Sequence, residues 1–173
     1  MTSLVVQSLL THDEYSDHLF DKTSPEQQMI MMIHLLLEKD NDVACWRNAS
    51  GLTPLHKATS LNPAYNLDVI KLMIKCCPQS IEVCDNFGKN ILHHLINRIV
   101  FHHKGSHFFE HTRLHGLINQ QDEQGNTPLV MAVISKDVIM VDLLKSVGGN
   151  LFIKNNQGHN AATLIQQTEI YKV

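Results

Sequence analysis

The stretch GLTPLHKA at positions 51–58 decides the fold of this chain, because versions of it return three more times. GKNILHHL stands at positions 88–95, GNTPLVMA at positions 125–132, and a weaker copy, GHNAATL, at positions 158–164. The leading glycines at 51, 88, 125 and 158 are 37, 37 and 33 residues apart. A fixed period in this range predicts a solenoid, in which each repeat is one supersecondary unit that stacks on the next.

Each copy contains a turn followed by the start of a helix. The residue three positions before the glycine is Asn or Asp in every copy: Asn48, Asp85, Asp122 and Asn155. Such a side chain can accept hydrogen bonds from the backbone amides that follow it, and the glycine can adopt a positive φ. Thr53 is then a good N-cap, and Pro54 fits the first helical position, where a missing N–H costs nothing. In the second copy Asn90 and Ile91 take these two places, which a helix start tolerates.

This motif, with its TPLH core and its period, resembles the ankyrin-repeat family. The resemblance covers most of the chain and implies an all-α ankyrin-repeat solenoid of stacked helix–turn–helix units with short turn or hairpin tips. It also implies that His56 and His93 tie neighbouring repeats together by hydrogen bonds, whereas Val130 cannot do so in the third copy. Residues 76–96 and 117–129 look like the ankyrin half of plant membrane-anchored ankyrin proteins of the accelerated-cell-death type. A short viral or bacterial ankyrin effector, or an inhibitor-of-NF-κB-like protein, would look similar at this length.

The spacing predicts one ankyrin-repeat domain over residues 1–173, with a cap at each end. The expected parts are an N-terminal cap (1–24), a partial first repeat (25–47), three repeats (48–84, 85–121 and 122–154) and a C-terminal cap repeat (155–173). Helices are expected at about 25–39, 54–61, 67–77, 90–99, 107–117, 128–135, 137–147 and 161–168. In the first of these, an apolar stripe that includes Leu36 and Leu37 is expected to be covered on two sides.

Composition narrows the function classes. A net charge of −3 gives no basic surface for sequence-independent binding of nucleic acid. No run approaches 18 apolar residues and residues 1–10 lack a basic start, so neither a membrane span nor a signal peptide is expected. The cysteines have no metal-ligand spacing and are expected to be buried thiols of an intracellular, cytoplasmic protein: Cys45, Cys76, Cys77 and Cys84. We expect the protein to be a monomer and to bind no cofactor.

Histidines are concentrated in the second repeat. His107, His111 and His115 are spaced by four, so they would share one helix face and could chelate a divalent metal. No acidic residue or cysteine supplies an obvious fourth ligand, so a solvated histidine face is the favoured interpretation. Asp85 and Asp122 are turn residues too far apart in sequence to act as an acid–base pair, and no Gly-rich phosphate loop is present. The chain is therefore not expected to be an enzyme.

Function in a repeat array is expected at the turn tips and on the exposed face of the first helices. Trp46 beside Arg47 is the leading hot-spot candidate, against the alternative that Trp46 only covers a core edge, and Phe87 is unusual at a tip. The predicted partner-binding residues are Trp46, Arg47, Lys57, Phe87, Lys89, His94, Asn97, Arg98, Glu123, Gln124 and Asn126. We expect a non-catalytic module that binds another protein in a scaffold or regulatory role, for example in immune signalling. The alternatives are histidine-dependent metal or pH sensing through residues 102–115, or a cytosolic regulatory domain of a larger membrane protein.

Overall fold

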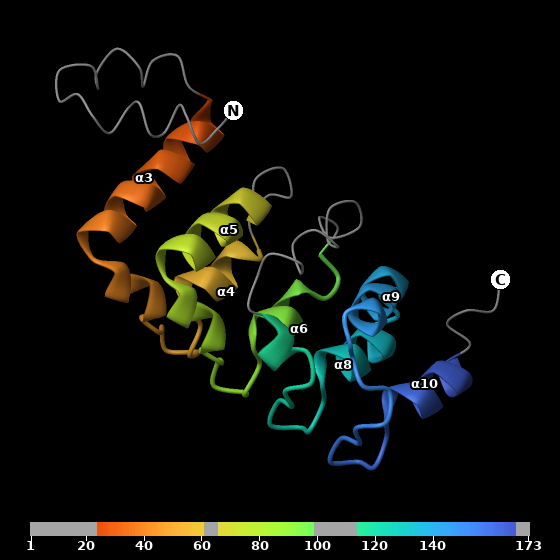
Figure 1. Ribbon diagram of the computed structural model, residues 1–173. Helices are drawn as coiled ribbons and strands as arrows, with labels where there is room; N and C mark the ends of the chain where they lie inside the picture. Colours follow the sequence, from red (N-terminus) through yellow and green to blue (C-terminus); the bar gives the residue numbers. More distant parts are fainter. Residues whose placement is uncertain (1–23, 61–65, 99–113, 169–173) are drawn as a thin grey trace, which may run out of the picture.

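The computed structural model describes residues 24–60, 66–98 and 114–168, which form a row of short helices joined by projecting loops (Figure 1). The α-helices are α3 (Pro25–Lys39), α4 (Pro54–Ala58), α5 (Asn66–Cys76), α6 (Ile91–Leu95), α8 (Pro128–Ile134), α9 (Val138–Ser146) and α10 (Ala161–Thr168). Short 3-10 helices are η1 (Asn41–Cys45), η2 (Pro78–Glu82) and η3 (Leu114–Leu117). These ranges contain no β-strand.

The helices stack in two layers. In one layer α4 packs against α6, α6 against α8 and α8 against α10, while α3 packs against α5 in the other. Contacts of α4 with α5 and of α8 with α9 join the layers. One apolar core runs through the stack, and its fully buried side chains include Leu55, Leu92, Leu129 and Leu144. The all-α solenoid expected from the repeat period is confirmed, because each unit buries its apolar face against the next one.

Residues at the helix ends explain why several boundaries match the prediction. In α3, Ser24 Oγ accepts from Gln27 N–H (3.3 Å) and Gln27 Oε1 accepts from Ser24 N–H (3.2 Å), which is a capping box. The predicted span of α3 is therefore confirmed, and so is that of α10. The apolar stripe of α3 was expected to be covered on two sides. It is only partly covered, because Leu37 is buried while Leu36 is 61% exposed.

Helix α6 is shorter than predicted. The sequence pattern extends the helix to about residue 99, yet α6 ends at Leu95, and Ile96 is already extended. Asn97 then adopts a left-handed φ of 61°, and its N–H donates to Asp137 Oδ2 at 2.7 Å. Asp137 is also the N-cap of α9, where its Oδ1 accepts from Met140 N–H at 3.1 Å. One buried carboxylate from the next unit thus binds the chain where α6 ends and starts α9.

Other predicted elements have mixed outcomes. Helices α5, α8 and α9 lie within one or two residues of their predicted spans, whereas α4 ends three residues early, at Ala58. Most of the helix predicted at 107–117 lies outside the described residues, and the described part, 114–117, is the 3-10 helix η3.

Within the described ranges, no helix has the length and apolarity needed to cross a bilayer. We propose that the repeats of the folded chain have the boundaries predicted from the sequence.

Candidate functional site

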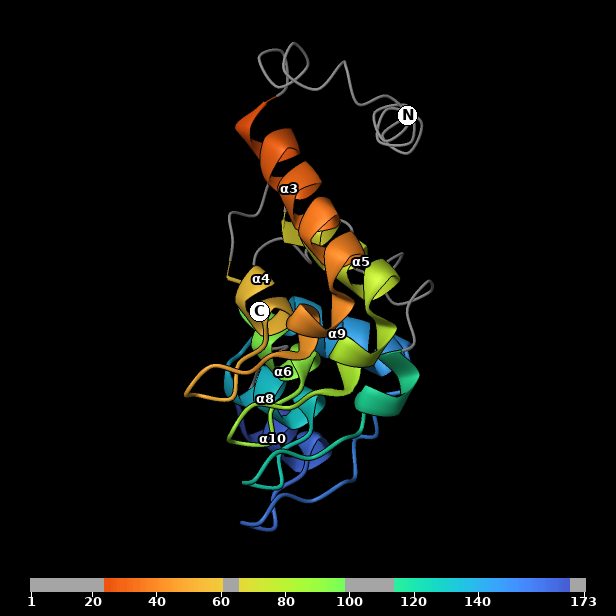
Figure 2. The same ribbon diagram turned by 90° about the vertical axis from the view of Figure 1, so that its left-hand side faces the viewer.

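The loops before α4, α6, α8 and α10 are four copies of one turn, and they project from the same side of the stack (Figures 1 and 2). In each turn the Oδ1 of the leading Asn or Asp accepts hydrogen bonds from the N–H groups two and four residues later. The distances are 2.9 and 3.0 Å for Asn48, 2.8 and 2.9 Å for Asp85, 3.0 and 2.8 Å for Asp122, and 3.1 and 3.0 Å for Asn155. The repeated Asn or Asp is therefore the acceptor that shapes each tip.

The glycine of each tip is favoured by a positive φ, and at the first and third tips it is also required by space. Gly51 has φ 75° and Gly125 has φ 76°, in the left-handed region that residues with a Cβ avoid. A Cβ on Gly51 would lie 2.5 Å from the backbone nitrogen of Asn86, and one on Gly125 would lie 2.7 Å from that of Asn156. Larger residues at these positions would push neighbouring tips apart.

The tips are joined to one another by backbone hydrogen bonds. The N–H of Asn86 donates to Ser50 O (3.3 Å), that of Glu123 to Phe87 O (2.9 Å), and that of Asn156 to Gln124 O (3.0 Å). These bonds occupy the same place in each successive pair of turns. The four tips therefore form one fixed row instead of four independent loops.

Side chains strengthen two of these junctions. Asn86 Nδ2 donates to Ala49 O (2.9 Å), and Asn156 Nδ2 donates in the equivalent way to Glu123 O (2.9 Å). Arg47 donates from Nε to Gly51 O (3.1 Å) and from Nη2 to Asn86 Oδ1 (3.0 Å). The sequence analysis did not single out Asn86 or Asn156, although both stand one residue after the repeated Asn or Asp.

The predicted partner-binding residues differ in exposure. Most are exposed at the tips or on the adjoining helices: Trp46, Arg47, Lys57, Phe87, Asn97, Arg98, Glu123 and Gln124. Lys89 and His94 are half-buried. The expected exposure of Asn126 is wrong, since the residue is only 5% exposed. Its Oδ1 accepts from Asn155 Nδ2 (2.8 Å), and its carbonyl oxygen lies 3.1 Å from His93 Nε2. Asn126 therefore joins units and is not available to a partner.

Exposed aromatic side chains mark the row of tips. Trp46 is 66% exposed and Phe87 is 60% exposed, and they belong to adjacent turns whose backbones are hydrogen-bonded. Trp46 therefore leaves most of its surface open to solvent. Phe152, which is 71% exposed near the fourth tip, was not predicted, because its apolar neighbours Leu151 and Ile153 give the pattern of a buried segment.

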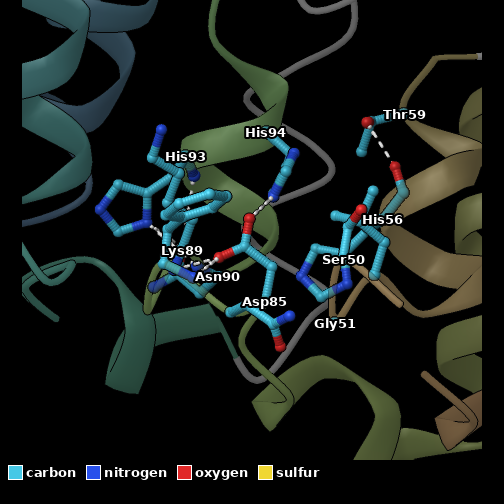
Figure 3. Close-up of polar contacts among 12 residues, drawn as sticks. Ser50, Gly51, His56, Thr59, Asp85, Lys89, Asn90, His93 and His94 are labelled. Carbon is cyan, nitrogen blue, oxygen red and sulfur yellow. Dashed lines mark hydrogen bonds and ion pairs between the residues drawn. The ribbon is translucent and has the colours of Figure 1, made fainter. Parts of the chain in front are cut away.

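His56 of α4 and His94 of α6 form a histidine group beside Asp85 of the second tip (Figure 3). The rings of His56 and His94 meet edge to face with centroids 4.8 Å apart. His94 Nε2 lies 3.0 Å from Asp85 Oδ2, so His94 connects α6 to the turn that carries Phe87. The sequence predicts His94 only as a residue of the exposed helix face, because its bond to Asp85 depends on the turn folding back toward the helix.

Burial controls the charge of this group. Burial lowers the pKa of His56 to about 4, and the neighbouring His94 acts in the same direction. Burial also lowers the pKa of His94, against the raising effect of Asp85, and Lys89 and Arg98 lower it further. Burial of Asp85 acts to raise its pKa, but hydrogen bonds from Lys89 N–H, Phe87 N–H and His94 outweigh this effect and leave the pKa lowered.

Among the described residues, the histidine tie between repeats has full hydrogen-bond geometry only at His93. His93 Nε2 lies 3.1 Å from the carbonyl oxygen of Asn126 in the next unit, so the predicted tie is confirmed there. Burial lowers the pKa of His93, and this hydrogen bond opposes the effect. The carbonyl oxygen of Lys89 takes the equivalent place beside His56 and acts to raise the pKa of that ring, but His56 Nε2 has no partner with hydrogen-bond geometry among the described residues. Val130 lacks a polar side chain, as expected.

The remaining chemical predictions concern metal and thiols. His107 and His111 lie outside the described residues, while His115 is exposed in η3. No group of three or more potential ligands that could hold a metal occurs in the described parts of the chain. Of the four cysteines only Cys77 is buried, which corrects the expectation for the other three, and burial raises the pKa of all four thiols. None of them is poised as a thiolate.

Comparison with known proteins agrees with the repeated architecture. A family model described as ankyrin repeats in many copies matches residues 25–74, and a single ankyrin repeat model matches residues 124–156. The chain is 24% identical over 131 residues to "Transcription factor MBP1" of Saccharomyces cerevisiae, which covers 69% of this chain and 16% of that protein. It is 25% identical over 138 residues to "Transcription factor MBP1" of Kluyveromyces lactis, covering 73% and 18%.

The chain thus spans less than a fifth of the length of these relatives. Both family models cover segments in which the structure has the repeated turn followed by a packed helix: α4 in one case and α8 in the other. The motif, the stacked helices and the matches agree that the chain is built of ankyrin repeats, which the family models match at residues 25–74 and 124–156.

Proposed function

We propose that this chain binds another protein through the first two tips and the helix face beside them, in a scaffold or regulatory role. Ankyrin repeats generally mediate protein–protein interaction, and the family is typically non-catalytic. The observation that carries the proposal is the exposure of Trp46 and Phe87, at 66% and 60%, on adjacent turns. Trp is among the residues most enriched at binding hot spots, and aromatic side chains are enriched at interfaces generally.

The fixed row of tips supports this proposal energetically. A partner that binds a flexible loop must also offset the entropy of ordering that loop, at about 1–2 kcal/mol for each residue whose backbone becomes fixed. Here the carbonyl oxygen of Phe87 already accepts from Glu123 N–H, and the N–H of Phe87 donates to Asp85 Oδ1. The backbone that presents Phe87 is thus held before binding.

Two double variants with similar exposure test the proposal. Trp46→Ala/Phe87→Ala removes the aromatic pair, while Met32→Ala/Leu36→Ala truncates side chains that are 57% and 61% exposed on α3. Proteins captured from source cells by the wild-type chain would be identified, purified and measured against both variants by calorimetry. We expect the aromatic double variant to bind at least about tenfold more weakly, with unchanged thermal stability. Equal affinity of the wild-type chain and this variant would reject the surface.

A further inference from the structure

Cationic side chains gather beside the two aromatic tips. Arg47 precedes the first tip, Lys57 is exposed on α4, Lys89 follows the second tip, and Arg98 lies just after α6. Arg98 Nη2 donates to Ser60 Oγ at 3.3 Å, which joins the ends of the two units. We call these four residues, with Trp46 and Phe87, the cationic face.

Electrostatic effects on the histidines support the proximity of Arg47, Lys89 and Arg98, and Lys57 directly follows His56 on α4. Burial lowers the pKa of His94 most, and Lys89 and Arg98 add to that effect, so both cations act on one imidazole. Arg47 acts in the same direction on the pKa of His56, whose ring touches that of His94. The Lys89 Nζ also lies 6.0 Å from the centroid of the Phe87 ring. Positive charge and aromatic surface are therefore side by side.

Carboxylates near this face are already occupied inside the protein. Asp85 is 7% exposed and accepts from two backbone amides and from His94, while Asp137 is 7% exposed and binds Asn97 and Met140. In the described parts of the chain, none of the four cations of the face forms a salt bridge. Glu123 is an exposed acidic residue at the third tip. The other exposed acidic residues of the described ranges lie outside the cationic face: Glu38, Asp40, Asp42, Asp68, Glu82 and Asp142.

We propose that the cationic face binds an acidic segment of a partner protein, with carboxylates facing Lys57, Lys89 and Arg98 and apolar side chains against Trp46 and Phe87. This inference rests on the proposed function and adds the chemistry of the partner. Charge complementarity supplies the argument, since a chain whose net charge is −3 carries four cations near Trp46 and Phe87, with the exposed Glu123 on the adjoining third tip. The net charge of −3 and the presence of only four cations on this face favour an acidic peptide over nucleic acid, because binding to nucleic acid depends on neutralising many phosphates.

Selection of peptides from a random phage-displayed library on the full chain tests this proposal. The charge variant is Lys57→Glu/Lys89→Glu, and its matched control is Lys71→Glu/Lys75→Glu on α5, which makes the same change of charge on exposed lysines elsewhere. We expect the wild-type chain and the control to enrich peptides with an excess of Asp and Glu, and the charge variant to lose that excess. Affinity of a selected peptide should fall about tenfold in the charge variant and should weaken as salt rises.

The outcomes separate the two proposals. Selected peptides that are neutral or basic, or equal losses in the charge variant and its control, would overturn the acidic partner while leaving the binding surface standing. A selection that enriches no peptide dependent on Trp46 and Phe87 would count against the proposed function itself. A single-stranded oligonucleotide that binds as tightly as the best peptide, and loses affinity in the charge variant, would assign the face to nucleic acid and overturn the inference.

Discussion

The second and third tips have the same turn, but they differ in what their carboxylates contact. Asp85 and Asp122 both use Oδ1 to accept two backbone amides. The second oxygen of Asp85 accepts from His94, whereas the second oxygen of Asp122 is buried and has no partner among the described residues. The residue nine positions after the Asp decides this, since it is His94 in one unit and Met131 in the other.

The turn and the chemical environment of its carboxylate are therefore specified by different residues. The Asn or Asp and the Gly needed for the turn recur at each tip, while in the two tips with Asp the residue on the helix determines whether the carboxylate is fully satisfied. The second unit is therefore rich in imidazoles whose pKa values burial lowers, at His93 and His94. The third unit has Val130 and Met131 in the corresponding places and no imidazole there to titrate.

The largest expected effect comes from breaking the link between the two units at Asp137. Asp137→Ala removes the N-cap of α9 and leaves the N–H of Asn97 without its acceptor. Loss of the cap and of a part-buried hydrogen bond should together lower the free energy of unfolding by about 2–4 kcal/mol. Urea unfolding measures this, with Asp137→Asn as a control that keeps one acceptor and should lose less. A loss in the Ala variant no larger than that of the Asn variant would contradict the shared role.

Acid should destabilise the first and second units before the third. The pKa of His56 in the folded chain, about 4, lies below the unfolded value of about 6.5, so the unfolded state binds more protons in between. The stability contributed by neutral His56 is complete above about pH 6.5 and is lost as the pH falls toward about 4. Between about pH 7.5 and about pH 5 the loss from His56 is about 2 kcal/mol, and His93 and His94 act in the same direction.

Native-state hydrogen exchange, corrected for the intrinsic effect of pH, would locate this loss. Amides of α4 and α6 should lose protection at about pH 5 more than amides of α8 and α9. In the variant His56→Leu, the protection of α4 and α6 should differ less between about pH 7.5 and about pH 5, whatever the stability of the variant itself. Uniform loss of protection over all four helices would show that the histidine group does not control the acid response.

Sequence analysis was most successful where local residues decide the structure. The spans of α3 and α10 and the shape of the tips follow from neighbouring capping and turn residues, such as Ser24 with Gln27. The end of α6 was missed because the acceptor that binds Asn97 lies 40 residues away, at Asp137. Asn126 was misjudged for the same reason, since its partners His93 and Asn155 belong to other units.

An exchange of the two helix residues would sharpen the comparison of the carboxylates. His94→Met should lower the free energy of unfolding by about 1–2 kcal/mol, because it leaves a buried oxygen of Asp85 without a donor. Met131→His should raise it by about 0.5–1 kcal/mol, since its Nε2–H can donate to Asp122. Both are measured by urea unfolding at about pH 7.5, where the imidazoles are neutral. Destabilisation by Met131→His as large as that by His94→Met would show that packing, and not the donor, makes the difference.

The smallest expected effect concerns the junction between the second and third tips. Asn86 and Asn156 each donate from Nδ2 to a carbonyl of the preceding tip, but Glu123, which stands between them, has no N–H in its side chain. Glu123→Asn places a donor at this position and should raise the free energy of unfolding by about 0.5 kcal/mol. Glu123→Gln is the control, because its amide is one methylene further from the backbone and should give no gain. If both variants gain equally, removal of the negative charge is the cause and the missing side-chain bond is not.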